Sequence, residues 1–354
     1  MQERNAPSGE LLRAREIVTG YRGKEIRIME VCGTHTHEIF RLGIRSLLPP
    51  CIRLISGPGC PVCVTPADFI DEALWLVAEK QVTICTFGDL VRVPGTSGSL
   101  VAARSRGGKI QVVYTPLDAV SYAKEHPSEE IVFLSVGFET TTPASCLAVK
   151  RARHLGLENF TLLTTNKTMD AAYLAMAGSA DAYLYPGHVC AITGTKLLED
   201  LAARGISGAV TGFTASEILT SLAVIVRKCQ EGISFFSNCY PRVVKKEGNP
   251  AAQKLVREYM DPCDSEWRGL GTMKGSGMRL KREYAAFDAR EKFFVPPIKG
   301  RNNPACRCGD VLQGKCLPKD CTLFSKACTP DHPIGACMVS QEGACSAFYQ
   351  YGLL

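Results

Sequence analysis

The sequence has no long hydrophobic segment. No run of about 18 apolar residues occurs in its 354 residues, and the first ten, MQERNAPSGE, are polar and lack the apolar core of a signal peptide. From these absences we expect a cytoplasmic protein with no membrane-spanning helix and no secretory leader.

The sequence also has no strong excess of one charge. Its 41 Lys and Arg and its 35 Asp and Glu give a net charge of +6. Short basic pairs, such as Lys245 with Lys246 and Lys281 with Arg282, are interleaved with acids, which is typical of a solvated face, so we expect neither nucleic acid nor membrane as a partner. The chain also lacks the CxxxCxxC, GxGxxG and GxxxxGK[ST] motifs, which argues against radical-SAM, Rossmann and P-loop proteins.

What the sequence has in excess is cysteine. It contains 17, and a reducing cytoplasm does not maintain a framework of disulfides, so the enrichment points to metal or catalytic thiols. Many lie in the Gly- and Pro-rich C-terminal segment, at positions 306, 308, 316, 321, 328, 337 and 345. Because this segment has little periodic apolar pattern, we expect a compact lobe held together by a metal centre.

Most of the chain alternates short apolar, β-branched runs with helical patterns, which is typical of parallel sheets covered by helices. The predicted strands are residues 26–31, 52–55, 82–86, 110–114, 131–136, 160–164, 182–185 and 208–211. We predict an α/β fold of two parallel-sheet α/β lobes plus a third, mixed α domain, with a closed barrel as the alternative to the two lobes. The expected ranges are 1–125 and 126–240 for the lobes and 241–354 for the third domain. The polar stretch 121–130 is the expected crossing between the lobes.

Polar segments recur in one structural position, between the end of a predicted strand and the start of the next helix. They are CGTHTHE, GPGCPVCVTP, GFETTTP and PGHV. Thr65 with Pro66, and Thr142 with Pro143, are typical of helix starts and place two of these segments just ahead of a helix. Open α/β sheets bind ligands at this rim, so we expect functional side chains there.

Cys60 and Cys63 have the spacing of a redox dithiol. A helix starting after Thr65 would lower the pKa of a thiol just ahead of it, and that of Cys63 more than that of Cys60. Half of a zinc site is one alternative, but no second CxxC completes it. Buried packing is another, although Pro61 and the flanking GPG stiffen the loop more than packing requires. Redox chemistry is the favoured interpretation.

Cys32 opens the segment CGTHTHE and is the first candidate metal ligand. A soft thiolate beside an imidazole suits a late transition metal. On a helix His35 and His37 would diverge by about 200°, so only one can face the metal, and we favour His35. Glu139 in GFETTTP and His188 in PGHV are further candidate site residues, with helix capping and a surface position as their alternatives.

The C-terminal segment offers a four-thiolate site. The candidate ligands are Cys308, Cys321, Cys328 and Cys345. Zinc or an iron–sulfur cluster would fit such loops, and the long spacings without CxxC pairs favour a 4Fe-4S cluster. The surplus cysteines are then Cys306, Cys316 and Cys337, of which Cys337 could replace one of the four by spacing alone.

Taken together, these segments resemble the HypD family of NiFe-hydrogenase maturation factors. The matching stretches are MEVCGTHTHEIF, ISGPGCPVCVTP, FGDLVRVPGT, VGFETTTPA, YPGHV, EGNPAAQ, CRCGDVLQGKC, CTLFSKACTP and IGACMVSQEGACSAFYQYG. They run in order from about residue 25 to the end of the chain. A small departure is Thr322, where the family often has proline.

The resemblance implies a scaffold that, with the small chaperone HypC, holds an iron atom while two cyanides and one carbon monoxide are attached. HypE with HypF supplies the cyanide, and the finished Fe(CN)2(CO) unit passes to the hydrogenase large subunit. By resemblance, Cys32 is the iron ligand, and Cys60 and Cys63 are redox active. The residues that match the family's 4Fe-4S ligands are Cys308, Cys321, Cys328 and Cys345. The implied fold is two α/β lobes with a cluster-bearing third domain.

These roles combine into one hypothesis of a metallocentre assembly scaffold with redox activity. Iron that carries cyanide and carbon monoxide is electron-rich and low-spin, so its assembly needs thiolate ligation and low-potential electrons. A dithiol between a cluster and the iron at Cys32 would deliver them. One alternative is a stand-alone iron–sulfur thiol–disulfide reductase, which has no role for Cys32 or His35. The other is a zinc-bound structural adaptor.

Overall fold

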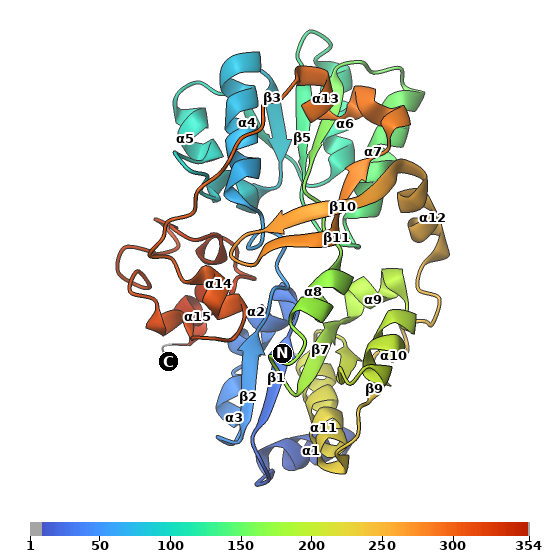
Figure 1. Ribbon diagram of the computed structural model, residues 1–354, viewed down its shortest axis with the longest axis vertical. Coiled ribbons are helices and arrows are strands. Elements are labelled where there is room, and N and C mark those ends of the chain that lie inside the picture. Colours follow the sequence, from blue (N-terminus) through green and yellow to red (C-terminus); the bar gives the residue numbers. More distant parts are fainter. Residues whose placement is uncertain (1–8, 353–354) are drawn as a thin grey trace, which may run out of the picture.

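The computed structural model describes residues 9–352 and contains two separate parallel sheets (Figure 1). The first has the strand order β2-β1-β7-β8-β9 and the second has the order β4-β3-β5-β6. The predicted α/β class with parallel sheets is confirmed. The closed barrel is wrong, because the strands form two open sheets.

The first sheet joins strands that are far apart in the chain. Its members are β1 (Ile26–Glu30), β2 (Ile52–Ser56), β7 (Ala182–Pro186), β8 (Gly208–Thr211) and β9 (Phe236–Asn238). Apart from β9, each matches a predicted strand closely; β9 is short and half-buried, so it shows no strong apolar run. The helices of this lobe are α1 (Gly9–Thr19), α2 (Gly33–Arg41), α3 (Ile44–Leu47), α9 (Gly187–Thr193), α10 (Lys196–Ala203) and α11 (Ala215–Glu231).

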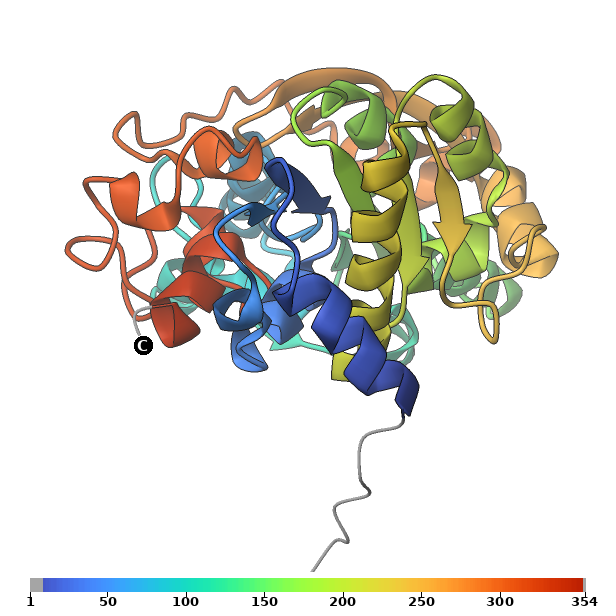
Figure 2. The same ribbon diagram turned by 90° about the horizontal axis from the view of Figure 1, so that it is seen from below.

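One face of the first sheet is covered by α1 and α11, which cross each other in Figure 2. Val18 of α1 and Leu222 of α11 belong to one buried cluster with Ile28 of β1. Thr214 and Glu217 form the predicted capping box at the start of α11.

The second sheet is formed by the middle of the chain. Its strands are β3 (Thr83–Thr86), β4 (Ile110–Val112), β5 (Ile131–Ser135) and β6 (Phe160–Thr164). Its helices are α4 (Ala67–Lys80), η1 (Gly88–Arg92), α5 (Leu100–Ser105), α6 (Pro116–Glu125) and α7 (Thr142–His154). The central strand β5 is buried along its whole length, as expected for a parallel strand covered on both faces.

The sheets do not follow the predicted division into residues 1–125 and 126–240. The chain leaves the first sheet after β2, crosses in residues 57–66, and returns in the segment that contains α8 (Met169–Ala175). Residues 121–130, the predicted crossing, instead form the end of α6 and the short link to β5 within the second lobe. Local patterns show that strands exist, but the pairing of β1 with β7 depends on contacts between distant segments.

The segment after residue 240 begins with structure that belongs to the second lobe. It contains α12 (Pro250–Tyr259), the antiparallel hairpin β10 (Met260–Trp267) and β11 (Gly271–Leu280), η2 (Arg282–Phe287) and α13 (Ala289–Phe293). The prediction of a mixed α domain here missed this hairpin, because its glycines hide a strand pattern. Met278 and Leu280 pack with Phe133 and Phe160 of the second sheet.

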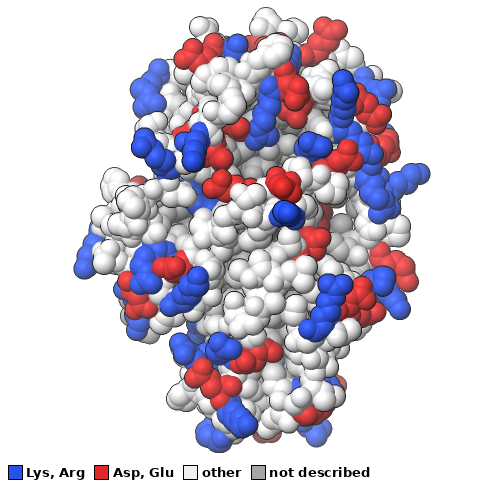
Figure 3. Space-filling view, in the orientation of Figure 1, with Lys and Arg blue, Asp and Glu red and all other residues white. Residues whose placement is uncertain are grey.

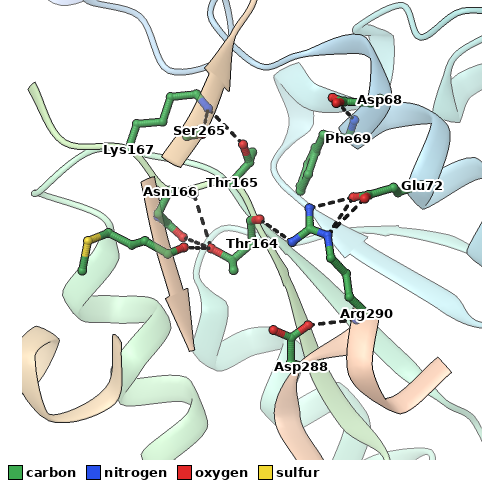
Figure 4. A network of polar contacts seen from close by, with 11 residues as sticks. Asp68, Phe69, Glu72, Thr164, Thr165, Asn166, Lys167, Ser265, Asp288 and Arg290 are labelled. Atoms are coloured by element: carbon green, nitrogen blue, oxygen red, sulfur yellow. Dashed lines mark hydrogen bonds and ion pairs between the residues drawn. The ribbon is translucent and has the colours of Figure 1, made fainter. Parts of the chain in front are cut away.

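A polar network fastens α13 and the hairpin to the second lobe (Figure 4). Arg290 donates to the Glu72 carboxylate from Nη2 at 2.7 Å and to the Thr164 carbonyl from Nη1 at 2.9 Å. The buried Lys167 amine donates to Ser265 Oγ at 2.8 Å. The Arg290 bonds join α13 to the second lobe, and the Lys167 bond joins β10 to the segment after β6.

The cysteine-rich end of the chain lies against the first lobe. It contains α14 (Cys308–Leu312), η3 (Pro318–Asp320), η4 (Ala336–Met338) and α15 (Ala344–Tyr351). Phe348 of α15 packs edge-on to Phe40 of α2, with 5.8 Å between the ring centroids. Figure 1 shows this segment in red beside α2, so the fold brings the last cysteines close to the segment after β1.

The surface agrees with the balanced composition. On the face drawn in Figure 3, acidic and basic side chains are interspersed around a largely uncharged centre. Among the helices of residues 9–352, none is both long enough and apolar enough to cross a bilayer.

Candidate functional site

Cys32 lies directly before α2, at the carboxyl end of β1. Its backbone is extended (φ −155°, ψ 126°), and its side chain is 1% exposed. Burial raises the pKa of the Cys32 thiol to about 12, while the backbone of His35 in the first turn of α2 acts against this rise. The thiol therefore stays protonated at neutral pH, and a bound metal ion would have to displace the proton.

The glycine loop ahead of the CxxC packs onto the backbone of Cys32. The Gly33 amide donates to the Gly59 carbonyl at 3.0 Å. A Cβ atom on Gly59 would lie 2.0 Å from the Cys32 backbone nitrogen, so this close approach needs a glycine. A Cβ atom on Gly33 would lie 2.9 Å from the Cβ of Cys60. The first cysteine of the pair is therefore adjacent to the Cys32 segment.

Cys60 and Cys63 lie in the loop that crosses between the sheets. Both are buried, and the Cys63 amide donates to the Cys60 sulfur at 3.3 Å. The N-cap of α4 is Pro66 and not Thr65 as predicted, because the Thr65 hydroxyl donates back to the preceding turn.

The two thiols of this pair differ in acidity. Burial acts to raise the pKa of Cys63, but hydrogen bonds with Cys337 and Cys60 lower it to about 6. Burial and the contact with Cys63 raise the pKa of Cys60 well above its usual value. The predicted order holds, with Cys63 the more acidic thiol. The neighbouring thiols of Cys337 and Cys60 are what lowers the pKa of Cys63.

Cys337 connects the CxxC with the other cysteines of the C-terminal segment. Its thiol hydrogen bonds with Cys308, Cys345 and Cys63 raise its pKa well above the usual value. The sulfur of Cys337 lies 2.6 Å from that of Cys308. A chain of thiol contacts thus runs from Cys60 through Cys63 and Cys337 into the C-terminal segment.

The C-terminal cysteines surround a small apolar cavity. The apolar side chains in its wall are Val311, Leu323, Phe324 and Met338. The cysteines in its wall are Cys306, Cys308, Cys321, Cys328, Cys337 and Cys345. All the predicted cluster ligands are therefore brought together, and two of the surplus cysteines join them.

Cys316 lies elsewhere, in a hollow of about 520 Å³ that Arg45 and Phe348 also line. Across residues 9–352, no group of three or more His, Cys, Asp and Glu side chains is arranged to hold a single metal ion. A 4Fe-4S cluster has a different requirement, because each of its cysteines binds a separate iron around a bulky inorganic core.

Glu342 is a residue of this site that the sequence interpretation missed. It reaches from the loop before α15 to the start of α2, where the Thr34 hydroxyl donates to Glu342 Oε1 at 2.6 Å. Its negative charge acts to raise the pKa of Cys32, Cys60 and Cys63. In the sequence Glu342 is visible only as an acid directly before GACSAF. That position does not reveal a contact with Thr34.

His35 is buried, but its ring lies against the loop between β8 and α11 and does not bond to Cys32. Its Nε2 is 2.9 Å from the Gly212 carbonyl oxygen, and its ring stacks on Phe213. His188 stacks on Phe213 as well, with 5.1 Å between centroids. Burial lowers the pKa of His35 to about 3 and that of His188 to about 4, so both rings are neutral at pH 7. His37 lies at the surface of α2, with Nδ1 3.2 Å from the Gln341 carbonyl oxygen.

Glu139 caps α8 and not α7, the helix that follows it in the chain. Its Oε1 accepts from the Met169 amide at the start of α8, at 2.7 Å. Burial raises the pKa of Glu139 to about 7. Cys190 of α9 is also buried, and the charges of Glu139 and Cys32 both act to raise its pKa. Glu139 and Cys32 thus both interact electrostatically with Cys190.

Comparison with known proteins identifies the family to which these motifs belong. A family model named HypD, described as the hydrogenase formation hypA family, matches residues 11–352. The chain belongs to the HypD family. It is 40% identical to the hydrogenase maturation factor HypD of Escherichia coli K12 over 336 residues, which cover 93% of this chain and 90% of the relative.

Other HypD relatives cover as much of the chain. HypD of Azotobacter vinelandii is 39% identical over 93% of this chain and 90% of its own length. The hydrogenase expression/formation protein HupD of Azotobacter chroococcum is 38% identical over 99% of this chain and 95% of its own length. The resemblance that the motifs suggested is therefore confirmed, and it includes both lobes and the cysteine-rich end.

Proposed function

We propose that this HypD-family protein is a scaffold on which the Fe(CN)2(CO) unit of a NiFe hydrogenase is assembled, with HypC as partner and HypE with HypF as cyanide donor. The observation that carries the proposal is the line of thiols that connects the Cys32 region to the C-terminal cavity. Cys60 lies next to the Cys32 segment, and Cys63 contacts Cys337, which contacts Cys308.

Iron is the cargo in this proposal, and Cys32 is its protein ligand. A thiolate donates electron density to iron, which favours binding of cyanide and carbon monoxide. The buried position of Cys32 excludes water from the metal and from its ligands. His35 is neutral but bonded to a carbonyl and stacked on Phe213, so it positions α2 rather than binding the iron.

The donor set around the C-terminal cavity suits a resident 4Fe-4S cluster. Cys321 follows η3, Cys328 lies in a loop and Cys345 lies in the first turn of α15, and all three line one apolar space. Arg268 is buried beside it, and its charge interacts with the sulfurs of Cys308 and Cys306. A buried cation suits a thiolate-ligated cluster, which carries negative charge. When bound, such a cluster supplies single electrons at low potential.

The fourth ligand is better supplied by Cys306 than by Cys308, which the spacing pattern selected. The Cys308 sulfur lies 2.6 Å from that of Cys337, whereas Cys306 lines the same cavity and interacts electrostatically with Cys308, Cys345 and Cys321. Cys308 and Cys337 then form a second dithiol between the cavity and the CxxC.

Thiol–disulfide exchange connects the two dithiols. The Cys337 sulfur attacks the Cys63 sulfur of an oxidised Cys60–Cys63 pair, which forms a Cys337–Cys63 bond, and the Cys337 proton passes to Cys60, which is released as a thiol. Cys308 then attacks Cys337, forms the Cys308–Cys337 disulfide and releases the Cys63 thiolate. Two electrons have moved to the CxxC, beside Cys32, and no atom is gained or lost.

Anaerobic purification with the HypC partner tests the proposal. Infrared spectra should show cyanide and carbon monoxide stretching bands, and Mössbauer spectra should show a 4Fe-4S cluster together with low-spin iron. A preparation that contains the cluster but shows no cyanide or carbon monoxide bands would contradict the assembly function and would favour a thiol–disulfide reductase.

A further inference from the structure

Several buried polar atoms near the candidate iron site have no hydrogen-bond partner within residues 9–352. They include the hydroxyl oxygens of Tyr173 and Tyr185, the Oε2 atom of Glu139 and the Nδ1 atom of His35. Buried polar groups in folded proteins are nearly always bonded, so a cluster of unpaired ones indicates that a bound molecule supplies the partner.

Of these groups, Tyr185 and Glu139 gather around Tyr173. The rings of Tyr173 and Tyr185 meet edge to face, with 5.0 Å between their centroids. Burial is the main reason why the pKa of the Tyr173 hydroxyl lies well above its usual value. The neighbouring groups that add to this rise are Cys190, Glu139, Tyr185 and Cys32. Tyr173 also belongs to the same buried cluster as Val31, the residue that precedes Cys32, and as Cys60.

Glu139 of the second lobe fixes the helix that carries Tyr173. It lies on α8, in the segment that returns the chain to the first sheet, and Figure 1 shows α8 at the junction of the lobes beside β7. The carboxylate of Glu139 binds the first amide of α8, and Tyr173 packs in the same core cluster as Cys60 and Cys63. The Glu139 carboxylate thus fixes the start of the helix that carries Tyr173.

The chemistry of the cargo indicates what this hydroxyl binds. Cyanide bound to iron through carbon presents an anionic nitrogen, which is a good hydrogen-bond acceptor, whereas the oxygen of bound carbon monoxide is a poor one. A phenol is a neutral donor and can satisfy that nitrogen without adding charge to the site.

We propose that the Tyr173 hydroxyl donates a hydrogen bond to the nitrogen of a cyanide on the iron held at Cys32, and so selects and orients one cyanide. This inference rests on the proposed function and adds a binding residue that recognises the diatomic anion. Tyr173 touches the cargo and takes no part in the redox steps.

The test compares Tyr173→Phe with Tyr183→Phe, both in the full chain with its HypC partner. Tyr183 is a matched control, since it is also a buried tyrosine but its hydroxyl donates to the Met176 carbonyl. A hydrogen bond at nitrogen raises the cyanide stretching frequency. We therefore expect one cyanide band of Tyr173→Phe to move to lower wavenumber, with the other cyanide band and the carbon monoxide band nearly unmoved. Tyr183→Phe should keep all wild-type positions.

A second measurement needs no variant. In the wild type, exchange from H2O into D2O should shift the same cyanide band, because the hydroxyl hydrogen is exchangeable. Wild-type bands that are insensitive to exchange, or unmoved in folded Tyr173→Phe, would overturn this inference and leave the proposed function standing. A wild type with no cyanide or carbon monoxide bands would overturn both.

Discussion

The sulfur atoms of Cys308 and Cys337 lie 2.6 Å apart, although 29 residues separate them in the chain. A disulfide has a sulfur–sulfur distance of about 2.05 Å, so a small movement would join them. The same Cys337 thiol bonds with Cys63 of the CxxC. This pair therefore lies where the cysteine cavity meets the first lobe. If Cys308 and Cys337 act as a pair, the remaining cysteines of the cavity are the candidate cluster ligands.

The ligand set of the cluster is tested by single serine substitutions. Cys306→Ser should lose most of the iron and acid-labile sulfide, because Cys306 faces the cavity with its sulfur available. Cys308→Ser should keep both, because its partner is Cys337. Cys316→Ser, in the separate hollow, is the control. If Cys308→Ser loses the cluster and Cys306→Ser retains it, the set predicted from spacing is the correct one.

Cys32→Ala should abolish iron that carries cyanide and carbon monoxide while leaving the 4Fe-4S cluster intact. The thiol is buried in the first lobe, outside the wall of the C-terminal cavity. The measurement is the infrared spectrum of the protein with its HypC partner, beside the visible spectrum of the cluster. Unchanged diatomic bands in this variant would remove Cys32 from the role of iron ligand.

Cys63 should react with an alkylating agent at lower pH than Cys60. Its pKa is lowered to about 6, so the thiolate forms as the pH rises through this value and reaction continues above it. Cys337→Ser should move this midpoint upward, since it replaces one of the thiols that stabilise the Cys63 thiolate. Rates are measured anaerobically against pH for Cys63 in Cys60→Ser and for Cys60 in Cys63→Ser, and the Cys63 rates are repeated with Cys337→Ser added. An unmoved midpoint would show that the Cys337 contact does not govern the acidity of Cys63.

The sequence predicted the elements of this fold better than their connections. Alternation of strand and helix was enough to locate β1 and β7, but their pairing is a long-range contact and leaves no local trace. The hairpin β10–β11 was missed because its strands contain glycines and are half-exposed, so no regular alternation appears.

The candidate site shows the same division between local and distant information. Cys32, Cys60 and Cys63 were identified because each lies in a distinctive local motif. Glu342 and Tyr173 were not, since an acid in a loop and a tyrosine on a short helix become informative only when the fold brings them to Cys32. The pairing of Cys308 with Cys337 likewise depends on how the C-terminal loops fold, which spacing alone does not specify.

Gly59→Ala should destabilise the protein and displace the CxxC loop. The new Cβ would lie 2.0 Å from the Cys32 backbone nitrogen, and neither backbone can yield without moving a strand end. Overpacking of this kind costs about 1–3 kcal/mol in the free energy of unfolding. Gly98→Ala is the control, because a Cβ there would meet no described atom within 4 Å. Thermal unfolding of both variants gives the comparison, and equal melting temperatures would show that the loop adapts.

Glu342→Gln should make the thiols around the iron site more acidic without unfolding the protein. The carboxylate acts to raise the pKa of Cys32 and Cys60, so an isosteric neutral amide should lower both. Gln can still accept the hydrogen bond from Thr34, which keeps α2 and α15 together. At a fixed pH below both pKa values, alkylation of Cys60 in a Cys63→Ser background should become faster, while Glu38→Gln, on the outer side of α2, should leave the rate unchanged. A slower reaction in Glu342→Gln would mean that this carboxylate accepts the thiol proton, and that it acts as a base for the dithiol instead of holding it protonated.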